Sequence, residues 1–166
     1  SWRPHKRLSE NISYFLENSS SDSVLLIAGK GVTKEDFSGF ENLLNRRIFY
    51  IGHLSWKQLI SIYKASSTFL HLAYLDHCPN VVVDAAACEC NIVCSSAGGT
   101  AEIPAKNKKI IKEKEWDFSP INLYEPPQMD FKNFIEKSDN NFKKIGDVSV
   151  EYFKQMENLI ETNTLL

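Results

Sequence analysis

Two carboxylates stand eight positions apart in a stretch that is otherwise almost wholly apolar or small, DHCPNVVVDAAACEC (residues 76–90). They are Asp76 and Asp84. Proline is favoured in the first turn of a helix, so Pro79 predicts a loop that carries Asp76, followed by a helix over 79–88 that contains Asp84. The first N–H groups of a helix have no intrahelical partner and bind anionic oxygens. The two acids therefore have two interpretations. They either cap and solvate a helix that packs in the core, or they contact a ligand that binds at the start of that helix.

The elements that must position these residues are visible as five short apolar runs between amphipathic segments. Continuous apolar runs of this length are typical of strands buried on both faces of a parallel sheet. Strands are predicted over residues 23–29, 48–52, 68–73, 91–96 and 107–112. Between them, the segment 55–66 predicts an amphipathic helix with Ser55 as its cap. This alternation predicts an α/β fold with a doubly wound parallel sheet.

The two ends of the chain are less regular. An irregular stretch with three prolines, 117–129, precedes helices predicted over 130–142 and 149–162. Residues 1–18 are typical of the end of a strand, a turn and a helix, but the strand itself is barely present. We therefore expect a single domain over 1–166 that is truncated at its N-terminus.

Composition excludes several classes of protein. With 166 residues, 43% of them hydrophobic, the chain can bury the core of one ordinary domain. A net charge of −2, from interspersed acids and bases, gives no electrostatic case for binding nucleic acid. No apolar run approaches the roughly 20 residues of a membrane-spanning helix. The four cysteines, Cys78, Cys88, Cys90 and Cys94, lack the CxxC spacing of a zinc site and favour free thiols in a reducing compartment.

Candidate ligand contacts fall after the strands, where ligands bind in parallel α/β sheets. Arg3 and Lys6 lie in the turn after the first strand, and glycine turns follow others in AGKG (28–31), GHL (52–54) and SSAGGTAE (95–102). Basic residues, glycine turns and a helix N-terminus at one edge of a sheet suit a phosphorylated ligand.

Simpler interpretations stay open for the same residues. The basic residues of the first turn are also compatible with solvated side chains, and Asp84 with a salt bridge to a lysine. Gly98 and Gly99 suit a turn and a ligand contact equally well. His71 stands between two leucines, which predicts a core histidine satisfied by a hydrogen bond.

The order of these motifs resembles that of retaining glycosyltransferases of the family 4 type, the glycosyl transferases of group 1. Their signature is an acid, seven residues, a second acid in an apolar helix, then an apolar strand and Gly-Gly-x-x-Glu. Here it is represented by Asp76, Pro79, Asp84 and AAACECNIVCSSAGGTAE. The segments SWRPHKRL, LLIAGKG, IFYIGHLSWKQLISIYKAS and SVEYFKQMENLIE also follow the family order. The resemblance covers most of the chain and is least secure over residues 104–148.

The resemblance implies a Rossmann-like, donor-binding half of a two-domain GT-B enzyme, which would bind a nucleotide-diphosphate sugar. Arg3 and Lys6 would hold the donor pyrophosphate, Asp84 the ribose hydroxyls, and Asp76 would contact the donor sugar as the catalytic residue. The other donor contacts would be Gly52, His53 and Leu54 beside the base, and His77, Cys78, Pro79, Asn80 and Val81 at the helix start.

The resemblance also implies the partners of the reaction. They are an unseen N-terminal acceptor-binding domain and a glycan, lipid or protein acceptor, and no metal cofactor is needed. The expected location is the cytoplasm, with peripheral membrane association through the unseen domain. The expected activity is that of a hexosyltransferase, with this domain alone inactive.

Departures from the family pattern leave other functions open. Both acids are aspartates where the family has glutamates, which shortens each by roughly one C–C bond of 1.5 Å. A misplacement of about 1 Å can cost on the order of 100-fold in rate. Glu89 and Asn91 replace the usual glycine and proline. The alternatives are a catalytically degenerate sugar-nucleotide-binding or interaction module, and another GT-B enzyme such as an epimerase, whose extra catalytic group has no candidate here.

Overall fold

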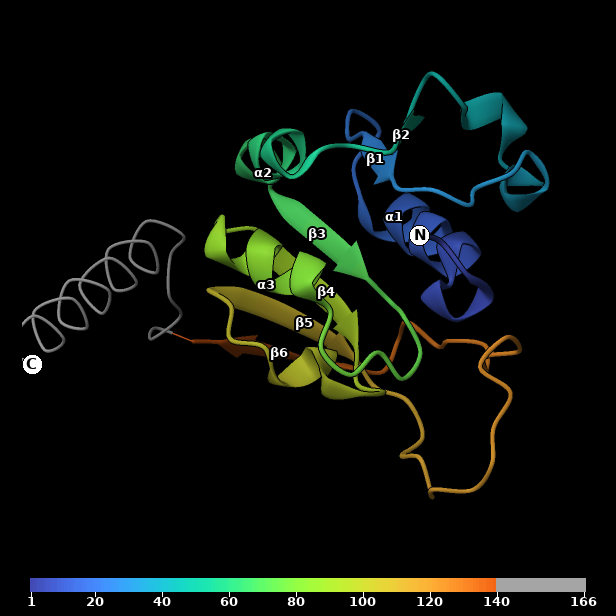
Figure 1. Cartoon of the computed structure of the whole chain (residues 1–166), viewed down its shortest axis with the longest axis vertical. Helices are drawn as coiled ribbons and strands as arrows, with labels where there is room; N and C mark the ends of the chain where they lie inside the picture. Colours follow the sequence, from blue (N-terminus) through green and yellow to red (C-terminus); the bar gives the residue numbers. More distant parts are fainter. Residues whose placement is uncertain (140–166) are drawn as a thin grey trace, which may run out of the picture.

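Parallel strands and covering helices form the part of the chain that the computed structural model describes, residues 1–139 (Figure 1). The helix predicted over 149–162 lies outside the described residues. In the described part, no helix combines the length and the apolarity that crossing a membrane requires.

The five predicted strands are all present. They are β1 (Leu25–Ala28), β2 (Ile48–Gly52), β3 (Thr68–His71), β4 (Asn91–Ser95) and β5 (Asn107–Ile111). β1 pairs with β2, and β3, β4 and β5 pair in that order, all in parallel. The continuous apolar runs thus correctly predicted parallel strands. β4 is almost wholly buried, whereas Leu26 of β1 and Tyr50 of β2 are exposed.

One predicted helix is wrong. The segment 130–142 contains a strand, β6 (Phe134–Ser138), which pairs antiparallel with β5. Ile135 lies beside Ile110, and the next residue pairs with Lys109, so alternate side chains face opposite sides of the sheet. The exposed edge of β5 supplies backbone hydrogen-bond partners that the sequence of this segment does not reveal.

Residues 1–139 contain three α-helices, of which one precedes β1 and two connect successive strands. They are α1 (Leu8–Asn18), α2 (Trp56–Ala65) and α3 (Asn80–Ala87), with 3₁₀ turns η1 (Pro4–Lys6), η2 (Glu35–Phe37), η3 (Glu41–Leu43) and η4 (Gly99–Glu102). Ser55 caps α2 as predicted: its Oγ accepts from the N–H of Gln58 at 3.4 Å, and the Gln58 side chain accepts from the N–H of Ser55 at 2.9 Å. This reciprocal pair satisfies backbone donors at the helix start.

Within residues 1–139 the strands form two sheets, β1–β2 and β3–β4–β5–β6, and helices cover both faces of the larger one. Tyr63 of α2 and Val82 of α3 share a buried cluster with Ile92 of β4. Tyr14 of α1 packs in a different cluster with Val93. Because Ile92 and Val93 are consecutive residues of one strand, α3 and α1 lie on opposite faces. The structure therefore confirms the predicted α/β, doubly wound architecture.

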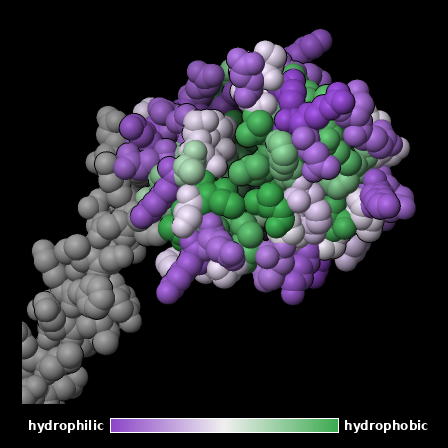
Figure 2. Space-filling model, turned by 90° about the horizontal axis from the view of Figure 1, so that it is seen from above, coloured by the Kyte–Doolittle hydropathy of each residue, from purple (hydrophilic) through white to green (hydrophobic). Residues whose placement is uncertain are grey.

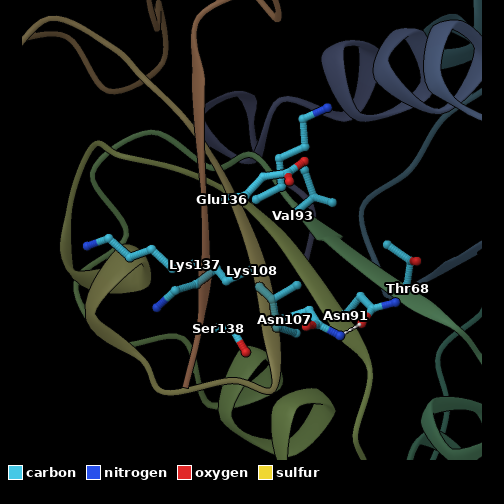
Figure 3. A pocket seen from close by; sticks show the side chains of 10 residues that line it. Thr68, Asn91, Val93, Asn107, Lys108, Glu136, Lys137 and Ser138 are labelled. Atoms are coloured by element: carbon cyan, nitrogen blue, oxygen red, sulfur yellow. Dashed lines mark hydrogen bonds between the residues drawn. The ribbon is translucent and has the colours of Figure 1, made fainter. Parts of the chain in front are cut away.

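A hollow of about 500 Å³ lies on the sheet at the amino ends of β3, β4 and β5 (Figure 3). Its lining is mostly polar and includes Thr68, Asn91 and Asn107. The Asn107 side-chain amide donates a hydrogen bond to the Asn91 side-chain oxygen at 2.9 Å. This hollow is therefore at the opposite edge of the sheet from the residues singled out above.

Candidate functional site

Asp76 is held between two basic side chains just beyond the carboxyl end of β3. Its Oδ2 accepts hydrogen bonds from Nζ of Lys6 and, at 2.9 Å, from Nε2 of His71. The hydrogen bond from His71 lowers the pKa of Asp76 most; burial acts in the opposite direction, and Lys6 adds to the lowering. The result is a pKa well below the ordinary value for an aspartate. Asp76 is therefore an ionised carboxylate with a fixed direction.

His71 is a member of this site that the sequence did not assign to it. It is buried, with 9% of its surface exposed, and its ring stacks on Phe69 with centroids 6.2 Å apart. The prediction of a core histidine satisfied by a hydrogen bond is confirmed. Its partner, the carboxylate of Asp76, lies only five positions away, and that short spacing was the available signal.

The loop that contains Gly98 and Gly99 passes directly against Asp76. Asp76 forms an isolated parallel bridge with Gly98, and its carbonyl oxygen accepts from the N–H of Gly99 at 3.0 Å. A Cβ on Gly98 would lie 2.6 Å from the carbonyl oxygen of Asp76, and one on Gly99 would lie 2.0 Å from that of His77. Both glycines therefore have a structural role, which is the close approach of two backbones.

The start of α3 differs slightly from the prediction. Pro79 is the N-cap and not the first helical residue, and its carbonyl oxygen accepts from the N–H of Val82 at 2.9 Å. The expectation that the first N–H groups of this helix lack an intrahelical partner is therefore wrong for Val82. The exposed first turn still presents the N–H groups of Asn80 and Val81.

The other predicted contacts around this helix are accessible. His77 and Cys78 are exposed in the loop before α3. Asp84 is half-buried within α3, and within residues 1–139 it forms no salt bridge. Its carboxylate oxygens thus remain available to a hydroxyl ligand.

The basic turn at the N-terminus contains one arginine that the sequence analysis missed. Arg3 is exposed, and η1 turns the chain so that Lys6 reaches Asp76. The next residue, Arg7, is buried and forms a two-pronged ion pair with Glu113, at 2.7 and 2.9 Å. Glu113 is 106 positions away, so no local pattern could identify this pair.

Gly52, His53 and Leu54 follow β2 at the same edge of the fold. Gly52 has a φ of +69° with open space where a Cβ would be, and its carbonyl oxygen accepts from the N–H of Gly29 at 2.7 Å. His53 is exposed and Leu54 is half-buried. The structure thus leaves this turn accessible, but no described contact links it to Asp76.

The four cysteines are free, as the sequence predicted. Cys78 is exposed, whereas Cys90 and Cys94 are buried. Burial raises the pKa of Cys90 and of Cys94 to about 11. The buried pair therefore behaves as small apolar side chains rather than as nucleophiles.

Comparison with known proteins identifies one family whose model matches the chain. A family model described as "Glycosyl transferases group 1" matches residues 2–118, which include every site residue described above. A search among curated proteins found no match. The match covers the strands β1 to β5 and ends before β6.

Proposed function

The chain belongs to the glycosyl transferases of group 1, and from this premise we propose that it binds the nucleotide-diphosphate sugar whose sugar is transferred to an acceptor. One observation carries the proposal. Lys6 meets Asp76 beyond the carboxyl end of β3, shortly before α3 begins, although 70 positions separate Lys6 from Asp76. Ligands of open α/β sheets bind at this edge.

The groups at this edge suit a diphosphate. Lys6 and the exposed Arg3 supply positive charge, and the first turn of α3 supplies the N–H groups of Asn80 and Val81. As the bond to the sugar breaks, negative charge grows on the leaving diphosphate. Fixed cations and helix N–H groups stabilise that charge without reorganising. We propose on this basis that transfer needs no metal ion.

The two aspartates would divide the remaining contacts. Asp76 would contact the transferred sugar, for which we propose a hexose, with retention of configuration. Asp84 would accept hydrogen bonds from the ribose hydroxyls, and the Gly52–Leu54 turn would border the base. The absence of a salt bridge to Asp84 within residues 1–139 supports its part of this assignment.

A titration of the chain with UDP-, GDP- and ADP-sugars, followed by amide NMR shifts, tests this proposal. Saturable shifts with one nucleotide are expected, and Asp84→Ala should weaken the affinity by about tenfold, the loss of a hydrogen bond to a charged group. Glu136→Ala, at the opposite edge of the sheet, is the matched control and should bind like wild type. Unchanged affinity of a folded Asp84→Ala variant would refute the ribose assignment.

A second candidate function is a degenerate sugar-nucleotide-binding module. Oδ2 of Asp76 is occupied by both Lys6 and His71, so this carboxylate has less freedom to turn to a sugar. Asp76→Glu, in the protein with its acceptor domain, separates the two functions. An enzyme should change its transfer rate with this substitution, whereas a module should show no transfer with either residue.

The partners follow from the same proposal. GT-B active sites lie between two domains, so an acceptor-binding domain would complete the site and bind a glycan, lipid or protein acceptor. We propose a cytoplasmic location, because nucleotide sugars and free thiols are both compatible with it.

A further inference from the structure

The two oxygens of the Asp76 carboxylate have different surroundings. Oδ2 accepts hydrogen bonds from both Lys6 and His71, whereas within residues 1–139 no side chain or backbone group donates to Oδ1. The Asp76 side chain is 18% exposed, so it is accessible to a ligand. Oδ1 is therefore the part of the carboxylate that can accept a hydrogen bond from a bound molecule.

The two donors to Oδ2 differ in how firmly they are held. His71 is the last residue of β3, lies beside Cys94 of β4 in the parallel ladder, and stacks its ring on Phe69 with an angle of 12° between the planes. Lys6 lies in the turn η1, and its flexible side chain is 25% exposed. His71 is thus a fixed donor, whereas Lys6 is a movable one.

A diphosphate would compete with Asp76 for Lys6. In the proposed function, Lys6 holds the donor pyrophosphate, which carries more negative charge than one carboxylate. If Lys6 alone fixed Asp76, donor binding would release the carboxylate just as the sugar arrives. The bond from Nε2 of His71, at 2.9 Å, keeps Oδ2 in place when Lys6 turns to the diphosphate.

The transferred sugar needs a partner with a defined direction. Apolar side chains, which Figure 2 shows gathered around a hollow on the face seen from above, cover a ligand but do not orient its hydroxyl groups. Ligand sites orient their ligands with a small number of placed polar groups. Oδ1 of Asp76 is such a group only while the carboxylate cannot rotate.

We propose that His71 is a positioning residue for the transferred sugar: its Nε2–H holds Oδ2 of Asp76, so that Oδ1 faces the sugar and Lys6 is free to bind the diphosphate. This inference rests on the proposed function, because it assigns a role within the same site. His71 does not itself touch the sugar. It must carry a proton on Nε2, because an ionised carboxylate can only accept a hydrogen bond.

The first test needs no ligand. NMR of the imidazole nitrogens of His71 should show a proton on Nε2 that exchanges slowly with water. Lys6→Met should keep this protected proton, because the bond from His71 does not depend on Lys6, and Asp76→Ala should lose the protection. A neutral ring with its proton on Nδ1, or loss of protection in Lys6→Met, would overturn the proposal.

The second test separates the contact to the sugar from the contact to the diphosphate. The ratio of the affinity for a nucleotide sugar to that for its nucleoside diphosphate, measured by NMR titration in the UDP, GDP and ADP series, isolates the contribution of the sugar. His71→Leu should lower this ratio by about tenfold, the loss of a hydrogen bond to a charged group, and leave the affinity for the nucleoside diphosphate nearly unchanged. His71→Gln, whose amide nitrogen lies close to the position of Nε2, should restore most of the ratio.

A matched control distinguishes lost position from lost stability. Ile135→Ala removes a partly buried side chain of β6 and should lower the Tm without changing the ratio. If His71→Leu does not fold, His71→Asn takes its place, because the shorter amide lies nearer to the position of Nδ1 and cannot replace Nε2.

Two contrary outcomes separate this inference from the proposed function. An equal ratio in the wild type and in His71→Leu would overturn the role of His71 and leave the proposed donor site intact. Failure of the wild type to bind any of the nucleoside diphosphates or nucleotide sugars would refute the proposed function, and this inference with it, even where the Nε2 proton of His71 is protected.

Discussion

Gly98 and Asp76 lie so close that a Cβ on Gly98 would be 2.6 Å from the carbonyl oxygen of Asp76. Gly98 also has a φ of +87°, which side-chain-bearing residues rarely adopt. The direction of the Asp76 carboxylate therefore depends on a glycine in the loop after the next strand, and not only on its own neighbours.

Gly98→Ala should destabilise the fold more than Gly39→Ala. Gly39 has a nearly identical φ of +85° but nothing within 4 Å of its Cβ position, so its replacement costs only the backbone strain, about 1–2 kcal/mol. Gly98→Ala adds the clash with Asp76, about 1–3 kcal/mol more. Urea unfolding of both variants measures the difference, and equal losses would show that the loop moves aside without cost.

Glu89→Gly should stabilise the protein. Glu89 has a φ of +67° just after α3, a position where the related family has glycine and where glycine is favoured at helix ends. Its exposed ion pair with Lys106, at 3.8 Å, contributes little. Relief of the backbone strain should raise the free energy of unfolding by about 1 kcal/mol.

Asn45→Gly is the control for this substitution. Asn45 has a similar φ of +58°, but asparagine tolerates the left-handed region better than glutamate. Its replacement should therefore raise the free energy of unfolding less. An equal gain in both variants would mean that the backbone strain at these two positions is the same for glutamate as for asparagine.

Asp76→Asn should cost stability only when Asp76 is ionised in the wild type. A carboxyl whose pKa is lowered by folding stabilises the fold fully above its unfolded pKa, near 3.9, and this contribution disappears as the pH falls towards the folded pKa. The variant should therefore lose about 1.5–3 kcal/mol at pH 7, and the loss should shrink below about pH 4. Urea unfolding at several pH values measures it, with Asp22→Asn on an exposed loop as control. A loss that is the same at every pH would contradict the electrostatic explanation.

Alkylation by iodoacetamide at pH 8 should modify Cys78 first. Burial raises the pKa of Cys90 and Cys94 to about 11, which leaves roughly 0.1% of each as the reactive thiolate at that pH. Mass spectrometry of peptides follows each site, and the two buried sites should react faster as the pH rises or when urea unfolds the chain. Rapid labelling of Cys94 in the folded protein would show that the core opens more often than its burial implies.

The strands were predictable because their apolar runs are continuous, and the start of α2 because Ser55 and Gln58 form a local capping pair. β6 was not predictable: Phe131, Phe134 and Ile135 have the spacing of a helix face, and only the edge of β5 decides the outcome. Pairing between distant segments outweighed the local pattern there.

The candidate site was likewise predictable in its local features but not in its contacts between distant segments. The sequence places Asp76, Asp84 and Lys6 on the correct loops and helix, but it does not reveal that His71 and Lys6 share one oxygen of Asp76. Arg7 was missed because its partners come from far along the chain. The donor contacts themselves stay predictions, as does the extent of the domain.

The guanidinium of Arg7 has a consequence for the order of folding. It donates to the carbonyl oxygen of Leu72, to Glu113 and to the carbonyl oxygen of Pro127, which are 65, 106 and 120 positions away. Contacts that close such long loops form late, because the chain must first lose the entropy of bringing its distant parts together. Lys6 is the adjacent residue, so we expect the turn that carries it to reach its final conformation only after the sheet and the segment around Pro127 are in place. We therefore expect the candidate site to be among the last parts of the molecule to assemble, after the strands and helices of a nascent or partly unfolded chain have formed.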